Sequence, residues 1–362
     1  MNYVCSFFLS LTALTCTAQS AKLPQVIPID HPAIVTQEFI YELKDALTPE
    51  CHASTVEVSN ETVVASWFGG TKERNKDVGI WISRNANGDW STPEEVANGI
   101  QEDGTRHPCW NPVLFKPEGE PLYLFYKVGP SPQEWWGLYM TSKDDGQTWS
   151  EPVMLPKGIL GPIKNQPIQL KNGTILSPSS NETVSGEWTI HIEHSNEDAQ
   201  SWSSSGPLDD PSEFGAIQPV ILNYGNGKLQ LLSRTKNNVI AENWSDDNGK
   251  NWDAMKATSL PNPNSGIDGV TLKDGRQLLV YNPTEKNWGD RVPLRLAISE
   301  DGQKWNRVLD LEPVRKTTDR EGEEYSYPTV MQAQDGMIHL VYTWNRKTVK
   351  YLVLDPAKLV SK

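Results

Sequence analysis

The chain has 362 residues, with 37% hydrophobic and 22% charged side chains, 26 Gly, 26 Pro and 14 Trp. This composition can bury a large core and punctuate it with many turns, and it excludes a disordered chain or a coiled coil. Lys and Arg number 33 against 46 Asp and Glu, and the net charge of -13 argues against nucleic acids and anionic membrane surfaces as partners.

The first eighteen residues, 1–18, are predicted to be a secretion signal, because an uncharged apolar stretch over 4–15 is followed by small residues around Ala18. The stretch is too short to span a bilayer, and no other segment is a candidate span. We expect a secreted or periplasmic protein with a linker over 19–35. A lipid anchor on Cys16 is the weaker alternative, since the preceding residues match a lipoprotein acceptor site poorly.

Beyond the linker, a strand, a glycine-type turn and a second strand recur six times. Such short apolar runs bounded by turn residues are typical of strands in a repeated β architecture. In chain order the paired segments are 52–56 with 63–67, 111–115 with 122–126, 166–170 with 174–176, 218–222 with 229–234, 268–272 with 278–281, and 327–331 with 338–342.

A second signature, Ser-x-Asp-x-Gly-x-x-Trp, follows each of the first five copies. It is complete over 142–149 and 245–252, and weaker versions end at Trp90, Trp202 and Trp305. The Ser and Asp side chains can bond to the turn backbone, Gly supplies a positive φ, and Trp packs the turn onto the sheet. We expect these residues to staple hairpins and to take no part in catalysis.

Two hairpins per repeat make a unit of four short strands, and radial repetition of such units predicts an all-β, six-bladed β-propeller over 36–362. The sixth unit runs out of chain after one further strand, 349–354. The N-terminal segment 38–43 is therefore predicted to supply its outer strand and close the ring. Because a closed ring leaves few strand edges exposed, we expect a monomer.

The first strand of each blade should line the central channel, so the residues that enter these strands should converge on one face. This polar set is the candidate site: His52, Asn111, Gln166, Gln218, Asp268 and Tyr327. The alternative is that these groups only bind water at the channel mouth. Cys51 and Cys109 precede the first two members in neighbouring blades, and they are either a disulfide or two buried thiols.

Two arginines stand near blade ends, Arg234 at the end of a second strand and Arg291 before the strand 293–298. If both face one pocket, they would bind a carboxylate through bidentate hydrogen bonds. Asp77 lies in a glycine-containing loop after the second strand of blade one.

Other stretches carry groups that suit a sugar. The loops 161–165 and 262–268 contain Lys164, Asn165 and Asn264, whose polar groups match sugar hydroxyls. Trp135 and Trp136 are either a stacking platform or part of a blade edge. The roles of His191 and Glu193, which share one face of a strand, stay open.

The boxes and the blade pattern together resemble the sialidase superfamily of BNR, or Asp-box, proteins over roughly 36–355. Family members that cleave sialic acid use three arginines on the carboxylate, a tyrosine nucleophile activated by a glutamate, and an aspartate as acid/base. The resemblance implies that Arg234 and Arg291 hold a carboxylate and that Tyr327 is the nucleophile, with Tyr325 as a backup. It places Asp77 close to the acid/base position.

Two positions depart from the family pattern. Cys51-His52 replaces the segment of the first arginine, and Gln218 stands where the activating glutamate is expected. Glutamine cannot take a proton, and a phenol is a poor nucleophile without a base. Either another group supplies the base or the reaction differs; the candidates for the base are Glu323, Glu324, Glu193 and His52.

Three functions follow from these residues. The first is an exo-acting glycoside hydrolase on a terminal acidic sugar of a glycan, such as sialic acid. The second is β-elimination from a uronic acid, in which His52 or Tyr327 removes the α-proton while an arginine neutralises the carboxylate. The third is a non-catalytic glycan-binding propeller. No metal or cofactor motif is present in the sequence, although acidic loops would allow a structural calcium ion.

Overall fold

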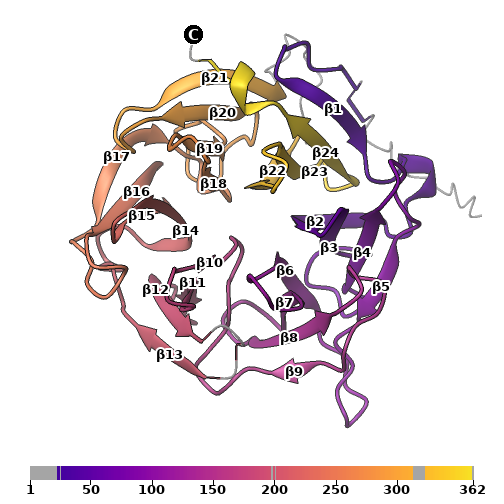
Figure 1. Ribbon diagram of the computed structural model, residues 1–362. Helices are drawn as coiled ribbons and strands as arrows, with labels where there is room; N and C mark the ends of the chain where they lie inside the picture. Colours follow the sequence, from indigo (N-terminus) through magenta and orange to yellow (C-terminus); the bar gives the residue numbers. More distant parts are fainter. Residues whose placement is uncertain (1–22, 25, 197–198, 200, 313–322, 361–362) are drawn as a thin grey trace, which may run out of the picture.

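The computed structural model describes residues 23–24, 26–196, 199, 201–312 and 323–360. These residues form six four-stranded antiparallel sheets, arranged as blades around a central axis (Figure 1). The first strand of each blade lies toward the axis and the last lies at the rim. The predicted all-β six-bladed propeller is confirmed.

The blades follow one another along the chain. Blade 1 contains β2 (Glu50–Ser59), β3 (Thr62–Gly70), β4 (Gly79–Asn85) and β5 (Glu94–Ala97). Blade 2 contains β6 (Cys109–Phe115), β7 (Leu122–Val128), β8 (Trp136–Ser142) and β9 (Val153–Met154). Blade 3 contains β10 (Ile168–Gln169), β11 (Ile175–Glu182), β12 (Trp188–Ser195) and β13 (Trp202–Ser205).

The second half of the ring repeats this order. Blade 4 contains β14 (Ala216–Gly225), β15 (Lys228–Thr235), β16 (Val239–Ser245) and β17 (Lys256–Pro261). Blade 5 contains β18 (Asp268–Thr271), β19 (Gln277–Tyr281), β20 (Leu294–Ser299) and β21 (Asn306–Glu312). Blade 6 contains β22 (Tyr325–Gln332), β23 (Ile338–Trp344), β24 (Thr348–Leu354) and β1 (Ile34–Phe39), and two short 3-10 helices span Leu43–Asp45 and Pro356–Lys358.

The N-terminal strand β1 closes the ring by pairing antiparallel with β24, as expected. Its position was predicted about four residues too late, because the segment after Phe39 leaves the sheet and forms a 3-10 turn at Leu43–Asp45. Trp90 fixes the closing strand from blade 1, since its indole donates a hydrogen bond of 2.8 Å to the Glu38 carboxylate.

The Asp-box turns have the predicted hairpin chemistry. In the box over 245–252, Gly249 has a φ of 79° and donates its backbone N–H to the Ser245 hydroxyl at 3.0 Å. The Asp247 carboxylate accepts the backbone N–H of Asn251 at 2.9 Å, and the Trp252 indole donates to the Gly249 carbonyl at 3.0 Å. All of these bonds lie within the turn, so each box stabilises the conformation of its own hairpin turn.

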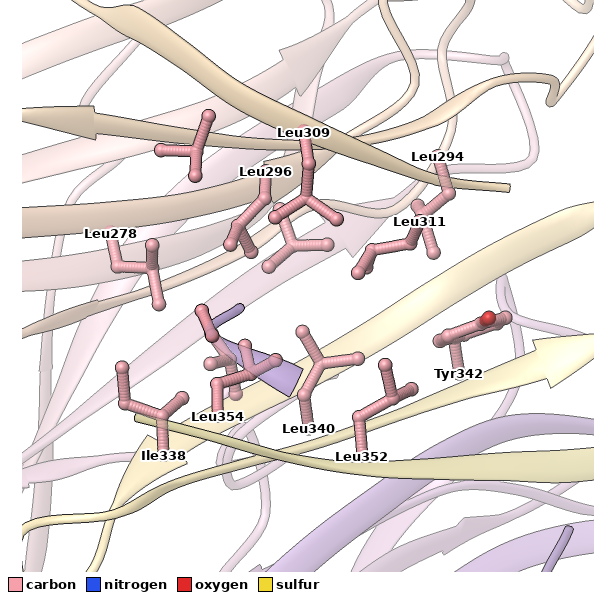
Figure 2. Close-up of a cluster of buried hydrophobic side chains, with 14 of the residues drawn as sticks. Leu278, Leu294, Leu296, Leu309, Leu311, Ile338, Leu340, Tyr342, Leu352 and Leu354 are labelled. Atoms are coloured by element: carbon pink, nitrogen blue, oxygen red, sulfur yellow. The ribbon is translucent and has the colours of Figure 1, made fainter. Parts of the chain in front are cut away.

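Apolar clusters join neighbouring blades. The cluster between blades 5 and 6 is built from β19, β20 and β21 on one side and β23 and β24 on the other (Figure 2). Leu278, Leu296, Leu340 and Leu352 are completely buried in it. Burial of each such side chain contributes roughly 1.5–3 kcal/mol, so contacts of this kind hold adjacent blades together.

Cys51 and Cys109 are both buried and both carry free thiols, so the disulfide alternative is wrong for this structure. Burial raises the pKa of the Cys51 thiol to about 12, which keeps it protonated at neutral pH. The predicted signal over 1–18, with Cys16, lies outside the described residues. Across the part of the chain that the structure describes, no helix has the length and apolar character needed to cross a membrane.

Candidate functional site

All six blades contribute side chains to one cavity of about 190 Å³ at a mouth of the central channel. Four members of the predicted convergent set line it: His52, Asn111, Gln218 and Tyr327. Arg234 and Arg291 line it as well. The structure therefore brings together the nucleophile candidate, both predicted arginines and both residues that depart from the family pattern.

The inner strands are distorted where they enter this cavity. Ala53, Asn111, Gln218 and Tyr327 have φ values of 52°, 30°, 55° and 52°, and each lies at a break in the strand register. The last three precede prolines, which cannot donate a hydrogen bond to the sheet. A non-glycine residue held in this backbone region costs of order 1–3 kcal/mol, and such strain concentrates at functional sites.

Arg234 lies at the centre of the cavity wall and is only 2% exposed. Its Nε donates to Asn264 Oδ1 at 2.8 Å, and its Nη1 donates to Gln218 Oε1 at 3.1 Å and to the Tyr327 hydroxyl at 3.0 Å. All three partners are neutral side chains.

The Arg234 guanidinium therefore has unused binding capacity. Among the described residues no carboxylate lies within 4.0 Å of it, and neither hydrogen on Nη2 has an acceptor. Burial lowers the pKa of Arg234 from its usual value, which reflects the cost of keeping this cation without an anionic partner. A bound anion would offset that cost.

Arg346, which the sequence analysis missed, supplies a third arginine. It follows β23 and lies beside His52, the residue that replaces the family's first arginine, with 3.4 Å between Arg346 Nη2 and His52 Nε2. Its Nε donates to Glu324 at 3.1 Å and its Nη1 to Glu73 at 2.5 Å. Arg346 thus places a cation beside His52 from a different blade.

Glu324 links two of the arginines. One carboxylate oxygen accepts from Arg291 Nη1 at 2.8 Å and from the Ser326 hydroxyl at 2.6 Å, and the other accepts from Arg346. These cations hold the pKa of Glu324 well below its usual range although burial opposes them. Glu324 is therefore ionised, but its lone pairs are occupied, which makes it a poor proton acceptor.

His52 packs against Tyr327, with ring centroids 4.2 Å apart. Burial and the neighbouring Arg346 lower the pKa of His52 well below its usual value, so the imidazole is neutral at pH 7. Its Nδ1 is buried and has no hydrogen-bond partner among the described residues. The neutral imidazole thus packs on the Tyr327 ring, with its Nε2 facing Arg346.

Two glutamates that the sequence analysis did not single out, Glu73 and Glu182, also line the cavity. Burial raises the pKa of Glu182, which suits a carboxyl group that must donate a proton. Asp77 is not among the lining residues; it is exposed, and its carboxylate accepts the backbone N–H of Thr71 at 2.8 Å and the Thr71 hydroxyl. These bonds lower the pKa of Asp77, opposite to what a general acid needs.

Four tryptophans form apolar walls of the cavity. Trp110 and Trp135 meet edge-to-face at 5.9 Å, and Trp188 and Trp288 meet edge-to-face at 6.2 Å. Trp288 remains 62% exposed. Aromatic faces of this kind stack on sugar rings. Of the predicted stacking pair, Trp135 lines the cavity whereas Trp136 is not a lining residue and contacts His107.

Several other predicted residues lie behind the cavity. Lys164 and Asn165 are buried, and their side chains bond to each other and to backbone carbonyls rather than facing the cavity. Asn264 does not line the cavity, but its Oδ1 accepts a hydrogen bond from Arg234 Nε and so orients the guanidinium. Tyr325 is completely buried against Trp344, which leaves Tyr327 as the tyrosine at the cavity.

The remaining candidates lie elsewhere. Gln166 and Asp268 line a separate cavity of about 200 Å³. The Glu193 carboxylate accepts the backbone N–H groups of Leu160 and Gly161 at 2.8 and 2.7 Å, with His191 beside it at 3.2 Å. Within the described residues, no cluster of three or more His, Cys, Asp or Glu could hold a metal ion.

One topological rule could have found the missed residues. Since the strands of a blade are antiparallel, the mouth where first strands begin is also the mouth where second strands end. Glu182 ends β11, Arg234 is the penultimate residue of β15, and Arg346 follows β23. The sequence analysis applied this reasoning to Arg234 alone. The charged lining residues are four arginines and two glutamates, namely Arg74, Arg234, Arg291, Arg346, Glu73 and Glu182, so the cavity is locally positive in a protein of net charge -13.

Comparison with known proteins supports the assignment of the fold. Residues 61–340 match the family model described as "BNR repeat-like domain". A search of curated protein sequences finds no significant match.

Solved structures with the same fold share little sequence with this chain. A protein of unknown function from Dyadobacter fermentans is 16% identical, with a TM-score of 0.70, over 89% of this chain and 98% of its own. The Hadza microbial sialidase Hz136 is 14% identical, with a TM-score of 0.74, over 90% of this chain and 69% of its own. The NanB sialidase of Streptococcus pneumoniae is 12% identical, with a TM-score of 0.69, over 92% of this chain and 72% of its own. At these identities the likeness concerns the fold alone.

Proposed function

Because the chain belongs to the family of BNR repeat-like domains and has the six-bladed sialidase-type fold, we propose that it is a glycan-processing hydrolase that releases a terminal carboxylated sugar. The buried Arg234, which has only neutral partners, is the observation that carries this proposal. A substrate carboxylate would give that cation its counter-charge and two acceptors for Nη2. Arg291, on the same cavity, would bind the carboxylate from a second direction.

Walls of tryptophan favour a sugar over a small aliphatic acid. Trp110, Trp135, Trp188 and Trp288 offer flat apolar faces, while Asn111 and Glu73 offer hydrogen-bonding groups. Sugar sites combine these two features, since a sugar ring has apolar faces and a polar rim. Exo action on a terminal sugar is part of this proposal.

For hydrolysis, Tyr327 would attack or stabilise the positively charged anomeric centre. Its hydroxyl is held by Arg234 at 3.0 Å and by the Gln218 amide at 3.4 Å. We propose Glu182 as the group that protonates the leaving oxygen, because it lines the cavity and burial raises its pKa. This replaces Asp77, whose carboxylate is engaged by Thr71. His52 would serve as the base in place of the missing glutamate.

One observation favours a second candidate, β-elimination from a uronic acid. Gln218 cannot be the carboxylate base that a tyrosine nucleophile needs. His52 is neutral and contacts Tyr327, and these two side chains would form an acid–base pair beside an arginine that binds the carboxylate. One of the two would remove the proton on the carbon next to the carboxylate. The electron pair would form the new double bond as the glycosidic oxygen leaves with a proton from the other.

Product analysis distinguishes the two reactions. The purified protein would be incubated with glycans that end in sialic acid or in related keto-acid sugars, and with glycans in which a uronic acid carries the next sugar on its O4, the position from which β-elimination expels the glycosidic oxygen. Release of an intact acidic monosaccharide, lost in Tyr327→Phe, supports hydrolysis. An unsaturated product that absorbs in the ultraviolet, lost in His52→Ala, supports elimination. Absence of any product on the whole panel, together with measurable binding, would favour the glycan-binding role.

Export also belongs to this proposal. Acidic terminal sugars occur on extracellular glycans, and the predicted signal over 1–18 would place the protein with them. N-terminal sequencing of the protein recovered outside the cytoplasm tests the point. Cleavage after residue 18 supports export by a signal peptide, and a lipid-modified Cys16 would support the anchored alternative.

A further inference from the structure

The loop between blades 2 and 3 enters the centre of the propeller and ends at Lys164 and Asn165. Lys164 is 3% exposed and Asn165 is completely buried. Neither side chain lines the cavity that holds Arg234 and Tyr327. Their polar atoms are instead directed at the backbone of the strands that carry the site.

These contacts fall on two of the four strained bulges, those of Gln218 and Tyr327. Asn165 Nδ2 donates to the carbonyls of Gln218 and Pro219 at 3.1 and 3.0 Å. Gln218 and Pro219 lie between the ladder pairs of Ile217 and Val220, so β15 does not pair with them. Asn165 thus donates hydrogen bonds to the two carbonyls in the bulge of β14 that do not pair with β15.

The ammonium of Lys164 holds the other bulge in the same way. It donates to the carbonyl of Pro328, directly after Tyr327, and to the carbonyl of Ile267 at 2.9 Å. Pro328 and Tyr327 also fall outside the ladder, between the pairs of Ser326 and Thr329. A third bond of 2.8 Å joins Lys164 to Asn165 Oδ1. One pair of neighbouring side chains therefore connects the backbone of Gln218 to that of Tyr327.

The loop itself is firmly anchored. The Glu193 carboxylate accepts two of its backbone N–H groups, from Leu160 and Gly161. The Gly161 carbonyl accepts from the Ser179 hydroxyl at 3.1 Å, and the buried Lys127 donates to the carbonyl of Pro162. Lys164 and Asn165 are thereby presented to the bulges from a fixed base.

We infer that Lys164 and Asn165 are positioning residues that hold Gln218 and Tyr327 in their left-handed backbone conformation and so set the contact of both side chains with Arg234. The expected fall in turnover rests on the proposed function. The expected displacement of Gln218 and Tyr327 rests on geometry alone. Small displacements of a reacting group cost large factors in rate, so loss of this support lowers turnover although neither residue touches the substrate.

The test compares three variants. Lys164→Met keeps the length of the side chain and removes its donors; Asn165→Leu removes the donors to the Gln218 bulge. Lys350→Met is the matched control, since Lys350 is an equally buried lysine that bonds to Glu312 and to neither the loop nor the bulges. Crystal structures, thermal stability, kcat and KM would be measured for each variant and for the wild type.

In Lys164→Met the 3.0 Å contact between Arg234 and Tyr327 is expected to break and kcat to fall about 10- to 100-fold with KM close to wild type. Asn165→Leu is expected to displace Gln218. Lys350→Met is expected to lose thermal stability with the contact and kcat retained. The inference is overturned if Lys164→Met folds with that contact intact, or if Lys350→Met loses the contact and kcat equally. If the wild type has no turnover, the proposed function fails, while the crystal structures still decide the inference.

Discussion

Nη1 of Arg234 donates a hydrogen bond of 3.0 Å to the hydroxyl of Tyr327, across 93 residues of sequence. The same nitrogen donates to Gln218, so one buried cation organises the tyrosine and the residue that stands in place of the family's glutamate. Because all of its partners are neutral, the guanidinium keeps its charge available for a ligand.

Gln218→Glu is expected to satisfy Arg234 internally. The new carboxylate would lie about where Gln218 Oε1 now accepts at 3.1 Å, forming a buried ion pair with Arg234. Thermal stability should rise, and affinity for a carboxylated sugar should fall about tenfold, or about 1.4 kcal/mol, because the cation is already neutralised. Gln218→Met, which removes the hydrogen bonds without adding charge, is the control. A variant that binds the acid as tightly as wild type would contradict the role given to Arg234.

His52 should make folding stability depend on pH in a defined window. Its pKa is lowered in the folded protein, so below about pH 6.5 the unfolded chain binds a proton that the folded chain does not. Stability is therefore full above that pH and falls as the pH drops toward 5. Urea unfolding at pH 7 and pH 5 should give a smaller difference in unfolding free energy for His52→Asn than for wild type. Equal pH dependence in the two proteins would rule out this effect.

Glu324→Gln should destabilise the protein by about 2 kcal/mol or more, because it leaves Arg291 and Arg346 without their shared carboxylate. The low folded pKa of Glu324 means that its contribution is present above about pH 4.5 and is lost as the pH falls further. Chemical unfolding at pH 7 measures the loss. The same measurement below about pH 4.5 should show a smaller destabilisation. A loss of unfolding free energy that is the same at pH 7 and below pH 4.5 would argue against an ionised Glu324.

Gly249→Ala tests the Asp-box turn. Gly249 has a φ of 79°, and an added Cβ would lie 3.1 Å from Leu176 and 3.3 Å from Leu229. The variant should lose about 1–2 kcal/mol from backbone strain plus a further loss from crowding. Gly275→Ala isolates the strain, since Gly275 has a φ of 90° with no atom within 4 Å of the new Cβ. Equal losses of unfolding free energy would show that crowding at Gly249 adds nothing.

Local and periodic features were predictable from the sequence. The Asp boxes depend on residues close in the chain, such as Ser245 and Gly249, so their hydrogen bonds could be anticipated. The six strand pairs repeat at a regular interval, so the propeller and its closing strand could be inferred as well. The bounds of β1 could not, because the turn at Leu43–Asp45 carries no strong signal in the sequence.

Contacts between distant segments were harder to predict. Arg346 occupies the space beside His52 from the opposite end of the chain, and nothing local in Asn345-Arg346-Lys347 indicates this. Lys164 and Asn165 have the residue types of a sugar site, yet the loop carries them behind it. Asp77 lies in the expected loop, but the pairing of its carboxylate with Thr71 depends on the loop conformation. Residue type and blade position were thus predictable, and side-chain direction was not.

The central claim is that the cavity binds a carboxylate through Arg234. Titration calorimetry of the wild type and of Arg234→Met, with free acidic sugars and with the neutral methyl esters of the same sugars, tests it most directly. Arg307→Met, which alters an exposed arginine outside the cavity, is the control. The account predicts that wild type and control bind the acids and not the esters, and that Arg234→Met binds neither. Equal affinity for acid and ester, or acid binding that survives in Arg234→Met, would contradict it.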